Sequence, residues 1–395
     1  MTDAILPTRR KRTPRPRDRR AQILAIAGDL FYRHGFHGVK MSQIADEAGI
    51  TPGALYRHYS SKQDLLAQAL TTAFDLGADG VSHEKAPNLP EMVGSLVATA
   101  GARRDLGVLW SREARHLDPE HLEQMRDRFF DFVTRLVTQL RTLRPELGPS
   151  DADLIAWCAL AVLTSPSYHS GRLGSERSAA LIRRLTLTVC TTPLDHESDI
   201  DQPTTTPDTG IMPQSRRESI LTAAARLFHS RGYQATSMHD IGAEVGISHA
   251  AVYKHFDSKG NLLSAVITRA SAPLQLGLNH ALATAATPAE ALDNALDAYI
   301  DFALVHHDLL GILVSEVRNV PDEHQHTVRR DQHDYVAEWV RLLTGARPDL
   351  DHAEAVYVVH ATLTTVNDAT RTASLRERQS LGSDLRVIGR RLLAP

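Results

Sequence analysis

Hydrophobic residues recur every three to four positions along most of the chain, which predicts a protein built from amphipathic helices. The first such stripe consists of Ile23, Leu24, Ala27, Leu30 and Phe31. It stops at Gly35, a second short helix stops at Gly49, and a third begins near Thr51 and Pro52. Helix, glycine turn and helix in this order predict a helix-turn-helix domain, whose last helix enters the major groove of DNA.

The same pattern occurs twice. Residues 19–66 return without a gap as residues 216–263, so that ITPGALYRHYSSKQDLL becomes ISHAAVYKHFDSKGNLL. Beyond these segments the repeat continues more faintly, with Glu113 and Arg115 echoed by Glu316 and Arg318. We infer that a complete unit was duplicated, with a small head followed by a larger helical domain in each copy.

The motifs in both copies resemble those of the TetR-type regulators. The first copy has Ile-Ala on its second helix, Gly-Ile at the turn, and then Leu-Tyr-Arg-His-Tyr and Ser-Lys followed by Leu-Leu. The second copy has Ile-Gly, Gly-Ile, Val-Tyr-Lys-His-Phe and Ser-Lys with Leu-Leu at the matching positions. The resemblance implies that double-stranded DNA is the partner and that each larger domain binds a small-molecule effector or pairs with another unit.

The predicted DNA contacts divide into two sets. Polar and basic side chains suit the phosphate backbone, and we assign to it Tyr56, Arg57, His58, Lys62, Tyr253, Lys254, His255 and Lys259. Small residues at the start of the third helix allow close approach to base edges, and we assign base reading to Thr51, Pro52, Gly53 and Ala54 in one head and Ser248, His249, Ala250 and Ala251 in the other. Because the two base-reading sets differ, we expect unlike half-sites and a loosely palindromic operator.

One local feature distinguishes the two heads. Thr236 and Ser237 precede the second helix of the second head and can cap it, whereas Val39 and Lys40 stand there in the first head. This leaves Ser42 or no residue at all as the cap of the second helix in the first head, and we expect that helix to start later.

The expected fold is all-α, with two tandem helix-turn-helix heads, each followed by a helical ligand-binding and dimerisation domain, in a pseudo-twofold single-chain dimer. We expect a disordered basic arm in residues 1–18, heads in 19–70 and 214–267, larger domains in 71–196 and 268–395, and a linker rich in Thr, Pro and Asp in 197–213.

Pairing between the two larger domains is implied by the resemblance. The expected four-helix interface joins residues 151–168 and 179–189 to residues 353–366 and 383–393. One chain would then be its own dimer, that is, a monomeric pseudodimer. The alternative is a true homodimer of doubled chains with four heads.

The effector is less well defined by the sequence. Large side chains on apolar stretches are the candidates for a ligand pocket, and they are Trp110, Trp157, Tyr168, Tyr299 and Phe302. For each of them, packing in the core is the more common explanation. The doubled architecture and the segments 35–37, 54–59 and 110–117 further resemble the double-headed actinobacterial regulators related to the repressor of a mammalian-cell-entry lipid-uptake operon, which implies control of lipid or sterol import and catabolism. Because repression is the family default, we expect a repressor released by a small effector of lipid or acyl type.

Composition sets the outer limits. The 395 residues carry a net charge of −3, but residues 9–20 alone hold eight basic residues and one acid, as expected of a segment that neutralises phosphates. We expect a cytoplasmic protein, because there is no apolar run long enough for a bilayer, no export signal, and only two cysteines, Cys158 and Cys190.

Two other functions are alternatives to a two-headed DNA-binding regulator. An enzyme is disfavoured because no metal-site spacing, nucleophile elbow or phosphate-binding glycine loop occurs, so we predict no cofactor and no metal. The other alternative is a regulator in which only the first head reads DNA and the second repeat is a pairing module.

Overall fold

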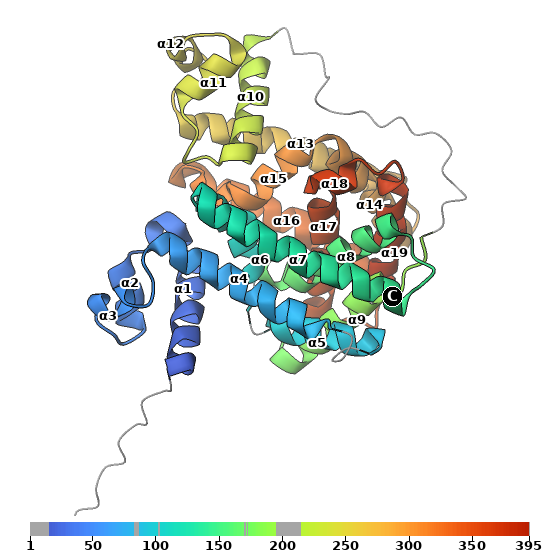
Figure 1. Ribbon diagram of the computed structural model, residues 1–395. Coiled ribbons are helices and arrows are strands. Elements are labelled where there is room, and N and C mark those ends of the chain that lie inside the picture. The colour runs from blue at the N-terminus through green and yellow to red at the C-terminus, as the bar shows by residue number, and fades with distance from the viewer. Residues whose placement is uncertain are drawn as a thin grey trace, which may run out of the picture.

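A computed structural model describes residues 16–82, 87–101, 103–169, 171, 173–194 and 215–394 of this chain. In that part of the chain every regular element is a helix, which confirms the all-α expectation (Figure 1). The predicted linker lies outside the described residues, as does most of the predicted basic arm. Cys158 and Cys190 are buried and free.

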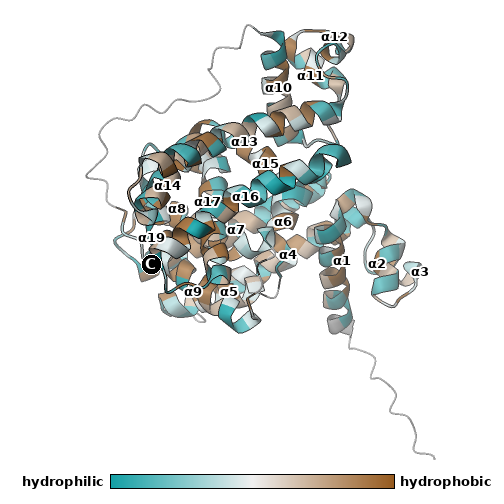
Figure 2. Ribbon diagram, turned by 180° about the vertical axis from the view of Figure 1, so that it is seen from behind, coloured by the Kyte–Doolittle hydropathy of each residue, from teal (hydrophilic) through white to brown (hydrophobic). Residues whose placement is uncertain are grey.

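Each head is a bundle of three short helices. In the first head these are α1 (Pro16–Gly38), α2 (Met41–Glu47) and α3 (Pro52–Tyr56), and in the second α10 (Arg216–Arg231), α11 (Met238–Val245) and α12 (His249–Tyr253). Gly49 and Gly246 make the turn before the third helix with φ angles of 63° and 72°, a left-handed conformation that favours glycine. Hydrophobic and hydrophilic residues lie side by side on these helices, as the predicted amphipathic pattern requires (Figure 2).

The expectation of a late start for the second helix of the first head is wrong. Helix α2 begins at Met41, the counterpart of Met238 at the start of α11. Lys40 occupies the cap position with extended backbone but makes no side-chain cap, whereas Ser237 and Asp240 form a complete capping box on α11. Packing of Ile44 and Ala45, which are fully buried, therefore sets the start of α2 without a cap.

The larger domains have matching helix orders. The first contains α4 (Lys62–Gly80), α5 (Leu89–Gly101), α6 (Leu106–Val108), η1 (Leu109–Glu113), η2 (Ala114–His116), α7 (Pro119–Leu143), α8 (Pro149–Thr164), η3 (Ser165–Tyr168) and α9 (Ser175–Cys190). The second contains α13 (Lys259–Thr284), α14 (Pro288–Val305), α15 (His307–Ser315), η5 (Val317–Asn319), α16 (Asp322–Ala346), α17 (His352–Arg371), α18 (Ala373–Arg376) and α19 (Leu381–Leu393). Helices α4 and α13 run through the predicted head boundaries, so each head is joined to its larger domain by a continuous helix.

The two units pack against each other through the predicted helices. Helix α8 lies along α17, and α9 contacts α19. Two arginines add ion pairs across this interface, with Arg378 2.6 Å from Asp151 and Arg177 2.6 Å from Asp351. The two heads project from the core at separate places, the first at its left and the second above it, with α3 and α12 at their outer edges (Figure 1). One chain thus supplies both halves of a pseudo-twofold pair.

Among the described helices, none is by itself long and apolar enough to cross a membrane. Helices α14 and α15 pass a test of length and composition only when taken together, and they are bent by 100° at His306.

Candidate DNA interface

The third helix of each head begins with a side-chain cap. The Thr51 hydroxyl accepts a hydrogen bond from the Ala54 amide at 3.2 Å, and the Ser248 hydroxyl accepts one from the Ala251 amide at 3.3 Å. Capping satisfies one of the free amides at the helix start and leaves the hydroxyl hydrogen available for a base. These two predicted base-reading residues therefore also hold the helix that presents them.

The two heads expose the same positions. Residues at the start and on the outer side of α3 and α12 are solvent-facing, whereas Leu55 and Val252 are fully buried beneath them. Tyr56 and Tyr253 are large side chains with 54% and 46% of their surface exposed. The exposed predicted residues are Thr51, Pro52, Gly53, Tyr56, Arg57, His58, Ser248, His249, Ala250, Tyr253, Lys254 and His255.

Two predicted phosphate ligands point inward instead. The Lys62 ammonium group donates to the carbonyl oxygens of Phe36 at 2.8 Å and Val39 at 2.9 Å, and it lies 4.3 Å above the Phe36 ring. Lys259 repeats this in the second head, donating to the carbonyls of Tyr233 and Thr236 at 2.9 Å each. Burial lowers the pKa of both lysines. Their main contacts close the loop after the first helix, which argues against the predicted phosphate role.

One further pair of basic side chains lies on the two heads; its first member, Arg20, ends the basic segment 9–20, whereas its second member, Arg217, was not among the predicted contacts. Arg20 lies 5.5 Å from the centre of the Tyr59 ring, and Arg217 lies 4.9 Å from the centre of the Phe256 ring, at equivalent places in the two heads. Both arginines are exposed. Alignment of the two repeats would have found Arg217, because it stands at the position of Arg20.

The predicted ligand-pocket residues pack into the core or form hydrogen bonds within it. The Trp110 ring lies 4.2 Å from that of Phe129, which in turn lies 5.3 Å from that of Trp157. In the second unit Tyr299 donates a hydrogen bond to Asn367 at 2.7 Å, and Phe302 packs on the main core. Tyr168 donates to the Gly107 carbonyl at 2.9 Å. All five side chains thus have core or hydrogen-bonding roles in this conformation.

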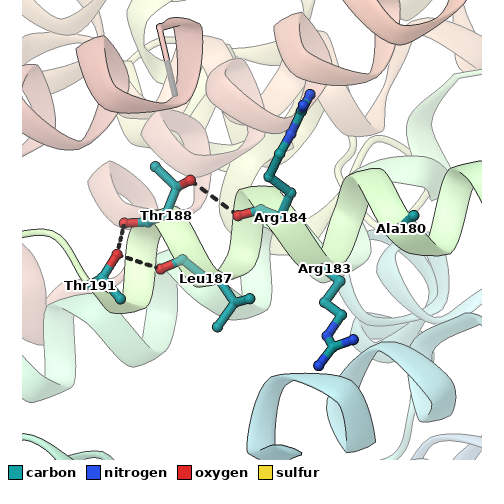
Figure 3. Close-up of a pocket in the computed structure, with 6 residues that line it drawn as sticks. All are labelled: Ala180, Arg183, Arg184, Leu187, Thr188 and Thr191. Atoms are coloured by element: carbon teal, nitrogen blue, oxygen red, sulfur yellow. Dashed lines mark hydrogen bonds between the residues drawn. The ribbon is translucent and has the colours of Figure 1, made fainter. Parts of the chain in front are cut away.

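Two hollows lie elsewhere in the first unit, and neither is lined by the five predicted residues. A small cavity of about 190 Å³ lies between α5, α6, η3 and α9, with Arg103, Arg104 and Ser178 among its lining residues. The second is an open groove along α9, where Arg183 and Arg184 leave the helix in opposite directions (Figure 3).

Among the described residues, one group of three side chains has the ligand types for a metal ion. His229 of the second head lies near His307 and Asp308, and one possible ligand atom from each residue lies within 4.8 Å of those of the other two. The guanidinium group of Arg376, however, lies 3.0 Å from Nδ1 of His307. Because the positive charge of Arg376 lies beside a ring nitrogen that would have to bind a metal cation, we do not assign a metal site here. We interpret these side chains as a polar cluster that holds the second head against the core.

Comparison with known proteins identifies the family. Residues 23–69 and 220–266 match the model of the bacterial regulatory proteins of the tetR family, and residues 285–378 match that of a tetracyclin repressor-like C-terminal domain. The transcriptional repressor KstR2 of Mycolicibacterium smegmatis is 31% identical over 152 residues, which cover 37% of this chain and 74% of KstR2. The chain therefore belongs to the TetR family of transcriptional regulators and carries two such units in tandem.

Other relatives match shorter stretches. The transcriptional activator FasR of the same organism is 38% identical over 96 residues, so that the match spans 24% of this chain and 43% of FasR. Among solved structures, the ketosteroid transcriptional regulator KstR2 of Mycobacterium tuberculosis has a TM-score of 0.37 and 24% identity, covering 43% of this chain and 91% of its own.

Proposed function

We propose that this protein is a sequence-specific repressor that reads an asymmetric operator with both heads of one chain and releases it when a small effector binds. The observation that carries the proposal is the agreement between the heads. Both present a capped third helix with the same positions exposed, including Tyr56 and Tyr253, over the same buried core. Family membership supports DNA binding, and KstR2 supports repression.

The base-reading surfaces support unlike half-sites. Thr51, Pro52 and Gly53 of the first head stand where the second head has Ser248, His249 and Ala250. The His249 ring can donate or accept a hydrogen bond at a base edge, whereas proline and glycine offer only apolar or backbone contact. The first half-site would then be read more by shape and methyl contacts, and the second more by hydrogen bonds.

The proposal is tested by removing the exposed tyrosine from one head at a time. DNA fragments from the region upstream of the gene are first screened by fluorescence anisotropy to find the operator. Tyr56→Ala and Tyr253→Ala are each expected to weaken operator binding about tenfold, because each loses a phosphate hydrogen bond and its packing. The exposed Phe130 on α7, far from the heads in sequence, supplies the control Phe130→Ala, which should bind as the parent does.

Each outcome has a distinct meaning. Failure to bind any DNA at low salt would overturn the proposed function. An unchanged affinity for Tyr253→Ala together with a large loss for Tyr56→Ala would instead favour the alternative in which the second repeat is only a pairing module.

The mass of the complex with DNA tests the single-chain arrangement. Packing of α8 on α17 and of α9 on α19 occupies within one chain the helices that the family resemblance assigns to pairing. We therefore expect one chain per operator. Two chains per operator would mean four heads and a longer site with twofold symmetry of its own.

We further propose an apolar effector of lipid or acyl type. The aromatic cluster around Trp110, Phe129 and Trp157 offers the kind of interior that an acyl chain or a ring system could enter. Oleate, oleoyl-coenzyme A and a steroid carboxylic acid are suitable probes. Binding at this cluster would change the tryptophan fluorescence and release labelled operator DNA. A ligand that releases DNA with no change in the fluorescence of Trp110 and Trp157 would place the site elsewhere.

A further inference from the structure

The first head contacts Arg318, an arginine of the second unit. At the end of the regular part of α1, Gly35 adopts a φ of 72°. A Cβ atom at this glycine would lie 3.4 Å from an Nη1 nitrogen that belongs to Arg318, on η5 of the second unit. Arg318 also lies 3.8 Å from the buried carboxylate of Glu113, which accepts a hydrogen bond from the Phe36 amide at 2.8 Å.

The second head rests in the same way on an arginine of the first unit. Gly232, which ends α10 with a φ of 84°, is the counterpart of Gly35. A Cβ atom there would lie 3.1 Å from the Cζ atom of Arg115, on η2. Arg115 donates a hydrogen bond to the fully buried carboxylate of Glu316. A third contact crosses between the units close by, since the Nε of Arg112 donates to the Val314 carbonyl at 3.0 Å.

The two arrangements are related by the internal repeat, because Arg115 and Arg318 hold equivalent places in the two units. Each head is thus contacted at the end of its first helix by the arginine of the other unit. The carboxylates that fix these arginines, Glu316 and Glu113, are buried, so their charges need a partner in this conformation.

We infer that Arg115 and Arg318 are crossed positioning residues: Arg115 of the first unit orients the second head, and Arg318 of the second unit orients the first head. This inference rests on the proposed function insofar as it concerns DNA. The physical basis of the positioning role is steric. Gly35 and Gly232 have positive φ angles, and a guanidinium group packed on each of them leaves little room for the head to rotate relative to the core. Because each arginine is held by the other unit's carboxylate, a shift between the units moves both heads together.

The crossed contacts of the two arginines would also couple effector binding in one unit to the orientation of the head of the other unit. Trp110 lies on η1, directly before the η2 turn that carries Arg115, and packs on Phe74 and Phe129 of the first larger domain. A ligand that displaces Trp110 would therefore act on the second head through Arg115. Coupling of this kind typically changes affinity about 5- to 150-fold.

The structural part of the inference is tested without DNA, by hydrogen exchange in the full chain. In Arg115→Gln, amides around Gly232 at the end of α10 should exchange at least about fivefold faster, while those around Gly35 stay unchanged. Arg318→Gln should give the reverse pattern. The control Arg128→Gln removes an exposed ion pair with Asp75 on the first unit and should change neither head.

A second variant guards against simple loss of folding. Arg115→Gln leaves the Glu316 carboxylate buried without its cation, so the double variant Arg115→Gln with Glu316→Gln removes both charges. The double variant should keep the fold, as judged by circular dichroism, and still show faster exchange at the second head. Faster exchange at the first head, or equal changes in both heads, would overturn the crossed arrangement.

The functional part uses operators in which one half-site is scrambled. With the first half-site scrambled, binding depends on the second head, and Arg115→Gln should lower affinity about tenfold relative to the parent protein. With the second half-site scrambled, Arg115→Gln should bind as the parent does, and Arg318→Gln should show the loss. A protein that shows the exchange pattern but binds no DNA would overturn the proposed function and leave the positioning role intact, whereas DNA binding without half-site selectivity would overturn the positioning role.

Discussion

The two heads have equivalent helices and expose equivalent positions, yet they are attached to the core differently. The interior of the first head, including Leu30 and Phe31, belongs to the same hydrophobic cluster as both larger domains. The interior of the second head, including Ile220 and Phe228, is a separate cluster that meets only a few residues of α15 and its neighbours.

The polar contacts differ as well. In the first head the Tyr32 hydroxyl donates to the Ser167 carbonyl at 3.1 Å. In the second head His229 stands at that position, 3.6 Å from Asp308, and it fits there because residue 311 is a glycine. The two heads therefore expose the same positions on the candidate DNA face, while the face that meets the core has one neutral contact in the first head and one titratable contact in the second.

The largest expected effect comes from giving both heads the same base-reading residues. Thr51→Ser, Pro52→His and Gly53→Ala together copy the second head into the first. Affinity for the natural operator should fall about 10- to 100-fold, because each mismatched base pair costs about 1–3 kcal/mol. Affinity for an operator made of two second-type half-sites should rise. Anisotropy titrations with both DNAs check this.

The reciprocal exchange in the second head is the matched control for that experiment, and it should favour two first-type half-sites. If neither triple variant changes the preference between the operators, the start of the third helix does not carry the sequence reading.

The next effect concerns Lys62 and Lys259. Replacing either by methionine leaves backbone carbonyls without donors and should lower the free energy of unfolding by about 1–3 kcal/mol. The slope of affinity against salt should stay unchanged, whereas the exposed Lys254→Met should reduce it. Urea unfolding and salt titrations separate the roles. A lower salt slope with unchanged stability for Lys62→Met would restore the phosphate role predicted from the sequence.

A smaller effect is the loss of folding stability as the pH falls. Burial lowers the pKa of His116 beneath the first head to about 4, while Asn319 stands at its place in the second unit. A histidine with a depressed pKa contributes stability that is complete above the unfolded pKa of about 6.5 and declines as pH falls toward 4. Between pH 7.5 and pH 5 the loss should approach about 2 kcal/mol for this one group. Thermal unfolding of the parent and His116→Asn across this range measures it.

The variant should show a shallower decline with falling pH than the parent, and the exposed His280→Asn should follow the parent curve. His229, whose pKa burial also lowers to about 4, still titrates in both proteins, so the comparison isolates His116. Parallel curves for His116→Asn and the parent would mean that this ring is not desolvated in solution.

The sequence alone predicts the head helices and the helices that pair the two units. Glycines and apolar periodicity placed the head helices, because local backbone preference and burial act together there. The resemblance to TetR-type regulators predicted the helices that pair the units, and the internal repeat predicted that both sets lie in one chain.

Other features depend on contacts that no local pattern records. The inward turn of Lys62 and Lys259 requires the carbonyls of a loop more than twenty residues earlier in each head. The internal repeat relates Arg115 to Arg318 and Glu113 to Glu316. Only the fold shows that each arginine pairs with the carboxylate of the other unit and contacts the head of that unit. His229 joins His307 and Asp308 only because head and core meet in space.

The smallest expected effect tests how far the heads differ in local stability. Helix α2 lacks the capping box that Ser237 and Asp240 give to α11. Lys40→Ser would place a serine three residues before Gln43, the spacing of a capping box, and should stabilise the first head by about 0.5–1 kcal/mol. Ser237→Ala should cost the second head about 1 kcal/mol. Hydrogen exchange of the α2 and α11 amides resolves the two changes. An unaltered α2 after Lys40→Ser would show that burial of Ile44 and Ala45 alone limits how often this helix opens.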